Sequence, residues 1–334
     1  MKEQVIPKYL YIKQNVLTNT FCKLGIFNIK NDKTPKELKV IKLRGNMTIQ
    51  KNNLTIQISD YSSLISLNKT KGFFTSTFKL FDALVIWFTN HNNEPDITFS
   101  LKDYMKLCGV SNIRELRSRV QEDLEILQSI TISYHDETKK KSNKYSDIKI
   151  IDNQSINNGL IRVHIAQEFD KILKKAPVMP YPTALFKIRS DKFPNAFYIL
   201  RKMIEHKNMN SNKPSSNTLS LKTLLQISPF IPTIDHVRKS SNPTPYNRII
   251  VPLLRDVHEA CRKIEIDDDC KLIYRNAEVL EIEIKKLFYE EIISDTYVRF
   301  PEVWPKYPEW KKHEKRRTKK KLKVKNNGTA AANS

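Results

Sequence analysis

The sequence predicts an α+β fold in which one series of helices and strands occurs twice in tandem. Its 334 residues allow two ordinary domains, and hydrophobic residues make up 40% of them, which is enough for two cores. The third observation is a repeat. The same series of elements begins at residue 76 and again at residue 196: an apolar helix, a helix that opens with Ser-Leu-Lys, a longer helix and a hairpin.

The N-terminal part contains one clear pattern. Residues 39–59 alternate between apolar and polar side chains on both sides of Lys51-Asn52-Asn53. Alternation around a short polar turn predicts a two-stranded hairpin. We assign it to an N-terminal extension, residues 1–70.

The first series begins with two helices. From Ser76 the apolar residues are dense enough for a buried helix, which ends in the loop before Pro95. Ser100, with Asp103 three residues later, resembles a capping box and predicts the start of a second helix. This helix ends at Gly109, the residue type best suited to the left-handed conformation after a helix.

A third helix and three strands complete the first series. Ser111 or Asn112 caps the helix, which carries an apolar stripe at helical spacing: Ile113, Leu116, Val120, Leu124 and Leu127. Strands are predicted at 130–134, 148–151 and 160–165, and the lysine-rich segment 135–146 links the first two. This order is the layout of a winged helix: two helices, a turn, a third helix and a hairpin with a basic tip.

The second series follows the same order. Helices are predicted at 196–206, from Ser220 and at 246–263, and a hairpin at 271–274 with 279–284. It departs from the first in an expanded turn at 228–243 and in Pro252, which must kink the third helix or mark a second start. Three prolines within residues 174–182 indicate a stiff connector between the series.

Charge divides the chain further. The net charge is +22, and residues 306–325 contain eleven Lys or Arg against two Glu, a balance of +9. The rest of the chain is therefore itself cationic, which argues for a polyanionic partner. The predicted fold is thus α+β, with two tandem winged-helix domains (71–175 and 176–300), the extension 1–70 and a basic disordered tail (301–334).

Several functional classes lack their motifs. The six glycines form no phosphate-binding loop, so we expect no nucleotide cofactor. No apolar run approaches the length of a membrane span, and the N-terminus has no secretory signal. The four cysteines are widely spaced, which predicts free thiols in a reducing cytoplasm and no zinc site. No His-x-His pair occurs, and Asp267-Asp268-Asp269 is typical of a solvated turn, so we expect no metal, no catalytic residues and no enzyme.

The third helix of the first series has the charge distribution of a DNA-reading helix. Three arginines lie in its first half and three acidic residues in its second half. A recognition helix enters the major groove with its N-terminal end, whereas the helix dipole alone favours the opposite distribution. The alternative is an ordinary solvated helix. The candidate DNA-binding residues are Lys102, Lys106, Ser111, Asn112, Arg114, Arg117, Arg119, Lys139, Lys140, Lys141, Lys144, Lys222, Arg238, Lys239, Asn247, Arg248, Arg255, Lys315, Arg316 and Arg317.

Two segments carry a resemblance to a known family. Phe99–Val110, followed by the arginine-bearing helix, resembles the first winged helix of plasmid replication initiators of the tandem winged-helix type. Tyr246–Arg255 resembles the start of the recognition helix in their second winged helix, and the likeness covers residues 75–290. It implies a non-enzymatic protein that binds repeated double-stranded DNA sites at an origin, promotes melting and recruits a host initiator and the replicative helicase. Many such initiators are autoregulatory dimers that pair through their first domain and monomers when they bind the origin, so the resemblance implies a homodimer as one of two states, and no membrane partner.

Two other functions remain open at this point. A winged-helix transcriptional repressor would use the same fold, because autoregulation makes an initiator resemble a repressor. A DNA-nicking or priming enzyme would require an active site that motifs do not reveal.

Overall fold

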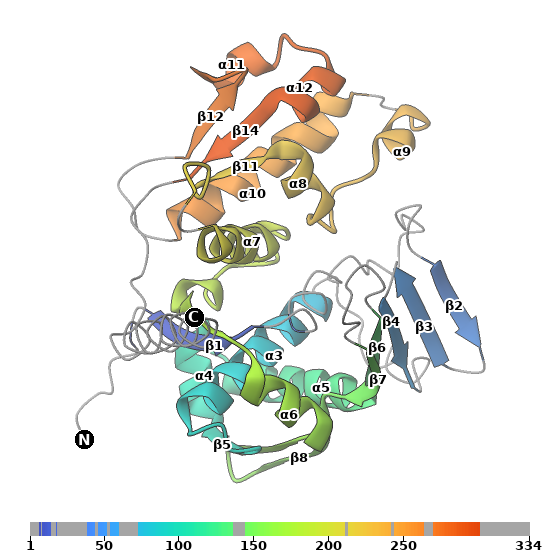
Figure 1. The fold of residues 1–334 in the computed structure, drawn as a ribbon, viewed down its shortest axis with the longest axis vertical. Coiled ribbons are helices and arrows are strands. Elements are labelled where there is room, and N and C mark those ends of the chain that lie inside the picture. The colour runs from blue at the N-terminus through green and yellow to red at the C-terminus, as the bar shows by residue number, and fades with distance from the viewer. Residues whose placement is uncertain are drawn as a thin grey trace, which may run out of the picture. The chain divides into compact units, whose positions relative to one another are not determined.

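The computed structural model describes residues 7, 9–14, 18, 39–43, 46–51, 54–59, 73–135, 144–210, 213–241, 244–263 and 270–300, and the structural statements below concern these residues. Helices and antiparallel sheets alternate along the chain, as expected for an α+β fold (Figure 1).

A first structural repeat spans residues 73–165. It contains α3 (Phe73–Asn90), β5 (Asp96–Ser100), α4 (Leu101–Cys108), α5 (Ile113–Ser129), β8 (Ile151–Asn157) and β9 (Leu160–Ile165). The three strands form one antiparallel sheet in the order β5-β9-β8, so the last strand lies between the other two. Asn158 and Gly159, both with positive φ, form the tight turn between β8 and β9.

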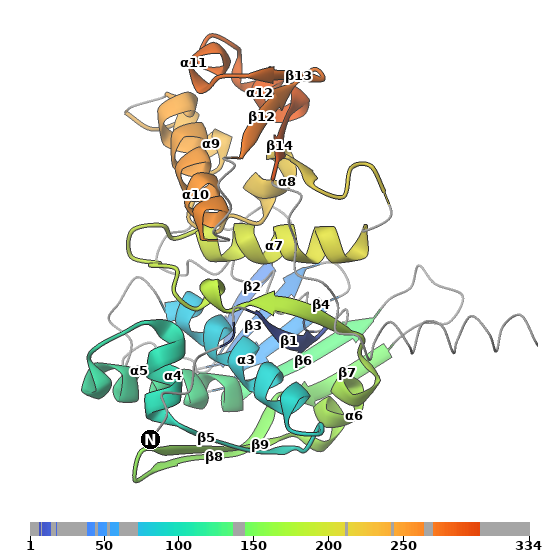
Figure 2. The same ribbon diagram turned by 90° about the vertical axis from the view of Figure 1, so that its left-hand side faces the viewer.

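A second structural repeat spans residues 196–299 and has the same order. It contains α7 (Ala196–Met209), β11 (Thr218–Ser220), α8 (Leu221–Gln226), α10 (Val251–Arg262), β12 (Lys271–Tyr274) and β14 (Thr296–Arg299). Again the last strand pairs with the first, because the sheet order is β11-β14-β12-β13, with β13 at Ala277–Val279 (β11 is labelled in Figure 1 and β13 in Figure 2). In both repeats the first strand leads directly into a serine that caps the next helix, Ser100 or Ser220.

A five-stranded antiparallel sheet lies outside both repeats. Its order is β2 (Lys39–Leu43), β3 (Asn46–Lys51), β4 (Leu54–Ile58), β6 (Ile130–His135) and β7 (Lys144–Lys149) (Figure 1). The hairpin predicted around 51–53 is present as β3 and β4, and Ile56 of β4 pairs with Ile132 of β6. The N-terminal extension therefore shares a sheet with strands that follow α5.

This sheet corrects the predicted basic wing. Strands β6 and β7 do pair, but they belong to the five-stranded sheet and not to the sheet that contains β5. The hairpin that joins β5 is β8 with β9, because its Asn158–Gly159 turn lets the chain return within two residues. Lys139, Lys140 and Lys141 lie outside the described residues, and Lys144 begins β7.

Two predictions in the second repeat have different outcomes. For the helix predicted at 246–263, Pro252 allowed either a kink or a second start. The structure has the second start, since a π-helical turn at Tyr246–Ile250 precedes α10 and Pro252 lies in the first turn of α10. The strand predicted at 279–284 is wrong beyond Val279. Residues Glu281–Ile284 form a short helix, α11, in which Ile284 is buried and Ile282 is exposed.

The cysteines also differ from expectation. Cys261, near the end of α10, forms a disulfide with Cys270 immediately before β12, and their Cα atoms lie 6.2 Å apart. The prediction of free thiols is wrong for these two residues. The chain returns from α10 to β12 within nine residues and so brings them to disulfide distance. Cys108 is free, and burial raises the pKa of its thiol to about 11.

Candidate nucleic-acid interface

The turn between α4 and α5 is set by local sequence. The Oγ of Ser100 accepts a hydrogen bond from the backbone N–H of Asp103 at 3.0 Å, which begins α4. Gly109 ends that helix with φ of 65°. The side-chain oxygen of Asn112 accepts bonds from the N–H groups of Arg114 and Glu115, so Asn112 is the cap of α5. Its predicted role in DNA binding must be shared with this structural role.

The arginines of α5 differ in exposure. Arg114 and Arg117 are exposed, as are Lys102 and Lys106 on α4 and Ser111 between the helices, whereas Arg119 is half-buried. The guanidinium of Arg117 reaches the carbonyl oxygen of Ile156 on β8 at 3.5 Å, a long hydrogen bond. The first half of α5 therefore presents two exposed cations, one of them next to the β8–β9 hairpin.

The buried side of α5 is anchored by an acid. Asp123 is 1% exposed, and its carboxylate accepts hydrogen bonds from Thr77 Oγ1 at 2.7 Å and Ser76 Oγ at 3.0 Å, both on α3. Burial raises the pKa of Asp123 to about 7, against the lowering effect of the two hydroxyls and of Arg119. This contact fixes α5 on α3 and leaves Arg114 and Arg117 exposed, whereas Arg119 lies on the same side of the helix as Asp123.

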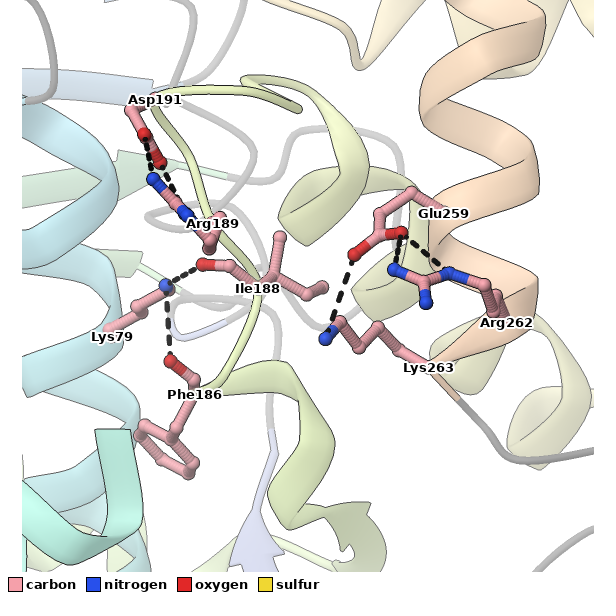
Figure 3. A network of polar contacts seen from close by, with 8 residues as sticks. All are labelled: Lys79, Phe186, Ile188, Arg189, Asp191, Glu259, Arg262 and Lys263. Atoms are coloured by element: carbon pink, nitrogen blue, oxygen red, sulfur yellow. Dashed lines mark hydrogen bonds and ion pairs between the residues drawn. The ribbon is translucent and has the colours of Figure 1, made fainter. Parts of the chain in front are cut away.

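One basic residue near this turn was not among the sequence candidates. Lys187 is exposed, and a Cβ added to Gly109 would lie 3.5 Å from its Cγ, so the lysine lies against the α4–α5 turn. The segment that carries it is held by Lys79 of α3, whose Nζ donates to the carbonyl oxygens of Phe186 at 3.2 Å and Ile188 at 2.6 Å (Figure 3). Desolvation lowers the pKa of Lys79 to about 8. The alternation in Phe186-Lys-Ile-Arg189 was the only sequence signal for Lys187.

The candidates of the second repeat fall into two groups. Lys222, Lys239 and Asn247 are exposed. The arginines have partners: Arg238 pairs with Glu290, and Arg248 donates to Ser240. Arg255 pairs with the buried Asp256 at 3.2 Å and lies over the Phe193 ring.

These pairings change the interpretation of the second repeat. An arginine that already neutralises a buried carboxylate, as Arg255 does, has a structural role that DNA contact would disturb. Arg238 and Arg248 would have to exchange their partners for phosphate. Among the described residues, no carboxylate pairs with the exposed Arg114 and Arg117 of the first repeat, so these arginines have no such partner to give up on binding DNA, unlike Arg238 and Arg255 of the second.

Other predicted features have simple outcomes. The tip of the β8–β9 hairpin, Asn157-Asn158-Gly159, has no basic residue, and the nearest one on β9 is the exposed Arg162. Lys315, Arg316 and Arg317 lie outside the described residues. Within the described part of the chain, no three His, Cys, Asp or Glu side chains are grouped so that they could hold a metal ion. No helix in that same part has the length and apolar character needed to cross a membrane.

No protein-family model and no curated protein matches this chain. Solved structures do resemble it. A Pi initiator protein in complex with iteron DNA is 12% identical with a TM-score of 0.46, and the alignment covers 89% of this chain and 100% of that one. Domains 2 and 3 of RctB are 12% identical with a TM-score of 0.41, over 73% of this chain and 86% of that one. A second structure of these RctB domains is 10% identical with a TM-score of 0.37, covering 79% and 90%.

Proposed function

We propose that this chain is a non-enzymatic replication initiator that binds repeated double-stranded DNA sites at an origin through two winged helices. The observation that carries the proposal is the α4–Gly109–α5 unit, with Arg114 and Arg117 exposed in the first half of its second helix. The unit recurs, in expanded form, as α8 and α10. The two winged helices would be residues 71–175 and 176–300, and the tail 301–334 would add sequence-independent attraction to DNA.

The positions of the exposed residues indicate which of them would contact bases and which would contact phosphates. Arg114 and Arg117 would reach base edges from the N-terminal half of α5, where bidentate contacts to guanine are the commonest specific interaction. Lys102, Lys106 and Lys187 would contact phosphate and fix the register without reading sequence. Asn158, at the hairpin tip, would replace the basic wing with an uncharged polar contact.

The test is binding to the DNA that flanks the chain's own gene. Protection footprinting should show repeated sites. Replacing Arg114 or Arg117 with Ala should weaken binding to them by about 1–3 kcal/mol and relax the preference at the contacted position. Lys171→Ala is the matched control, because Lys171 is exposed on α6 (Gln167–Lys175) and pairs with Glu168. Unchanged affinity and unchanged site preference in both arginine variants would overturn the assignment.

Binding alone does not separate an initiator from a repressor, since both would protect the same DNA. Origin-dependent maintenance of a plasmid that carries the flanking DNA does separate them, because a repressor does not support it. A nicking enzyme would instead relax the supercoiled plasmid in the presence of divalent metal.

A further inference from the structure

The second repeat contains an insert that the first repeat lacks. In the first repeat only Asn158 and Gly159 separate β8 from β9. In the second, the corresponding strands β12 and β14 are separated by Arg275–Asp295, which includes β13, α11 and α12 (Tyr289–Asp295). We call these 21 residues the insert; Figure 1 shows it in orange and red beside β12 and β14. Because the three-stranded pairing forms without it in the first repeat, the insert is an addition to the fold.

Three large apolar side chains of the insert are exposed to solvent. Leu280 is 68% exposed, Ile282 67% and Phe288 78%, and all three fall within nine residues of chain. Exposed apolar residues that are scattered singly are ordinary, whereas three large ones this close together in the chain call for an explanation. We call the three side chains the apolar face of the insert.

Folding does not explain two of these residues. Leu280 is the N-cap of α11 and Phe288 the N-cap of α12, positions where Ser, Asp and Asn stabilise a helix and Leu and Phe do not. The backbone N–H groups of both residues donate to the glutamate three residues later, Glu283 Oε2 at 2.7 Å and Glu291 Oε2 at 3.3 Å, but Leu and Phe have no side-chain oxygen to accept in return from the first turn of the helix. The side chains of Leu280 and Phe288 therefore do not contribute to helix capping.

The insert is nevertheless well anchored. Two of its own side chains, Ile284 and Ile292, are buried. The carboxylate of Glu281 contacts His258 Nε2 of α10 at 2.6 Å, and Glu290 pairs with Arg238, so two carboxylates join the insert to residues outside it. The apolar face is thus presented by fixed elements, which lowers the entropic cost of binding.

Charge identifies the kind of partner. The insert contains six acidic residues against three basic ones, a balance of −3 in a chain of +22. Glu278 and Glu290 pair with Lys271 and Arg238 outside the insert, so this surface is weakly acidic and offers nucleic-acid phosphate no net attraction. A protein segment with an apolar stripe flanked by Lys or Arg complements it in both respects.

We propose that the apolar face of the insert docks a basic amphipathic helix of a partner protein. The partner packs its apolar stripe on Leu280, Ile282 and Phe288, and its flanking cations meet the carboxylates of the insert. This inference does not depend on DNA binding, so either proposal can fail alone.

The experiment measures binding of a model peptide to the full chain by fluorescence anisotropy. The probe is a labelled helix of about 18 residues made of Leu and Lys, with Leu at i, i+3, i+4 and i+7 spacing. One control peptide has the same composition in scrambled order, and another has Glu in place of Lys. The full chain should bind the Leu/Lys helix and neither control. Hydrogen exchange should then show slower exchange over residues 279–292 when the peptide is bound.

The variant Leu280→Ser/Phe288→Ser makes the test specific. Serine is a favourable N-cap, so the variant should unfold at the same temperature as the parent chain or higher. Its affinity for the Leu/Lys helix should fall at least about tenfold, because a few exposed anchors dominate such interfaces. Met209→Ser, at an equally exposed apolar side chain on α7, should retain the affinity.

Three outcomes would overturn the proposal. Equal binding of the scrambled peptide would show charge attraction alone, and equal affinity of the serine variant would place the peptide elsewhere. Self-association of the chain that the serine variant abolishes, seen by sedimentation without peptide, would make the face an interface between copies.

Discussion

Arg201 of α7 and Asp82 of α3 form a buried ion pair that joins the first helices of the two repeats. The guanidinium donates to both carboxylate oxygens, at 2.9 Å and 3.1 Å, and the hydroxyl of Tyr181 donates to the same carboxylate at 2.6 Å. The side chains of Asp82 and Arg201 are 0% and 5% exposed. A buried pair of this geometry fixes two helices against each other, since loss of either partner removes a counter-charge from the core.

We therefore expect Asp82→Asn to lower the free energy of unfolding by about 3–5 kcal/mol, because it removes the carboxylate charge that faces the buried guanidinium of Arg201. The measurement is urea denaturation at neutral pH. The double variant Asp82→Leu/Arg201→Met should recover much of the stability, because apolar residues of similar volume remove both charges together.

The exposed pair Arg189–Asp191, at 2.7 Å, provides the control. Its side chains are more than 60% exposed, so Arg189→Ala should leave stability almost unchanged. A double variant less stable than Asp82→Asn would contradict this account of the pair and point to packing around the site as the main source of the destabilisation.

A second prediction concerns pH. The pKa of Asp123 is about 7 in the folded chain because of burial, against about 4 for a free aspartate. The folded state thus binds this proton more tightly than the unfolded state does. Stability should fall as pH rises from 4 to 7, by a few kcal/mol at most. Comparison of unfolding midpoints at pH 5 and pH 8 tests this.

Asp123→Asn isolates the contribution of that carboxyl. Asn can still accept the bonds from Thr77 and Ser76. The variant should gain stability relative to the parent chain as pH rises, and the gain should level off above pH 7. A constant difference between the two proteins across this range would mean that the folded-state pKa is not raised.

The sequence predicted the helix ends well, because capping is local. Ser100 and Gly109 bound α4 as expected, and Asn112 proved to be the cap of α5 out of the two candidates. The apolar stripe of α5 also holds, since Val120, Leu124 and Leu127 are all buried. Each feature depends on residues within about one turn of one another.

Pairings between distant segments were not predictable in the same way. Strand β5 was missed although Ile97 and Phe99 alternate with exposed residues, because five residues with two apolar positions also fit a loop. The hairpin of β6 and β7 was assigned to the wrong sheet, since no local signal says whether β6 pairs with β4 or packs with β5. Asp82 interrupts an apolar run and gives no indication that its partner is Arg201, 119 residues further along the chain.

In the candidate interface too, local features were predictable from the sequence and contacts between distant residues were not. Exposed positions on α5 followed from helical periodicity, so Arg114 and Arg117 were placed correctly on the surface. The engagement of Arg255 with Asp256 and Phe193 required knowledge of what lies beneath α10. Charge count alone cannot distinguish a cation that faces solvent from one that already has a carboxylate partner.

A third prediction concerns Gly109, whose φ of 65° is unfavourable for residues with a Cβ. Gly109→Ala should cost about 1 kcal/mol of stability, because left-handed backbone is strained in L-residues. The added Cβ meets Lys187 only at ordinary contact distance, so the cost comes from the backbone. Gly109→Asn should cost less, since Asn tolerates this conformation. Thermal unfolding of the two variants measures the difference, and equal destabilisation would implicate the side-chain contact instead.

The last prediction concerns the tail and its way of binding DNA. Residues 306–325 contain eleven Lys or Arg, and no aromatic residue follows Trp310, so this segment can contact phosphates but has little with which to read bases. Deleting residues 311–334 should weaken binding to cognate and scrambled duplexes by similar factors. It should also make the slope of log affinity against log salt concentration shallower by about 0.9 for each phosphate that the tail no longer neutralises.

The measurement is a salt titration of the full chain and the truncated chain on both duplexes. Arg114→Ala is the comparison, since that change should affect the cognate duplex more than the scrambled one. If the truncation leaves the slope unchanged, or weakens cognate binding alone, the tail is not a general electrostatic anchor, and recruitment of a host protein becomes the better explanation of its charge.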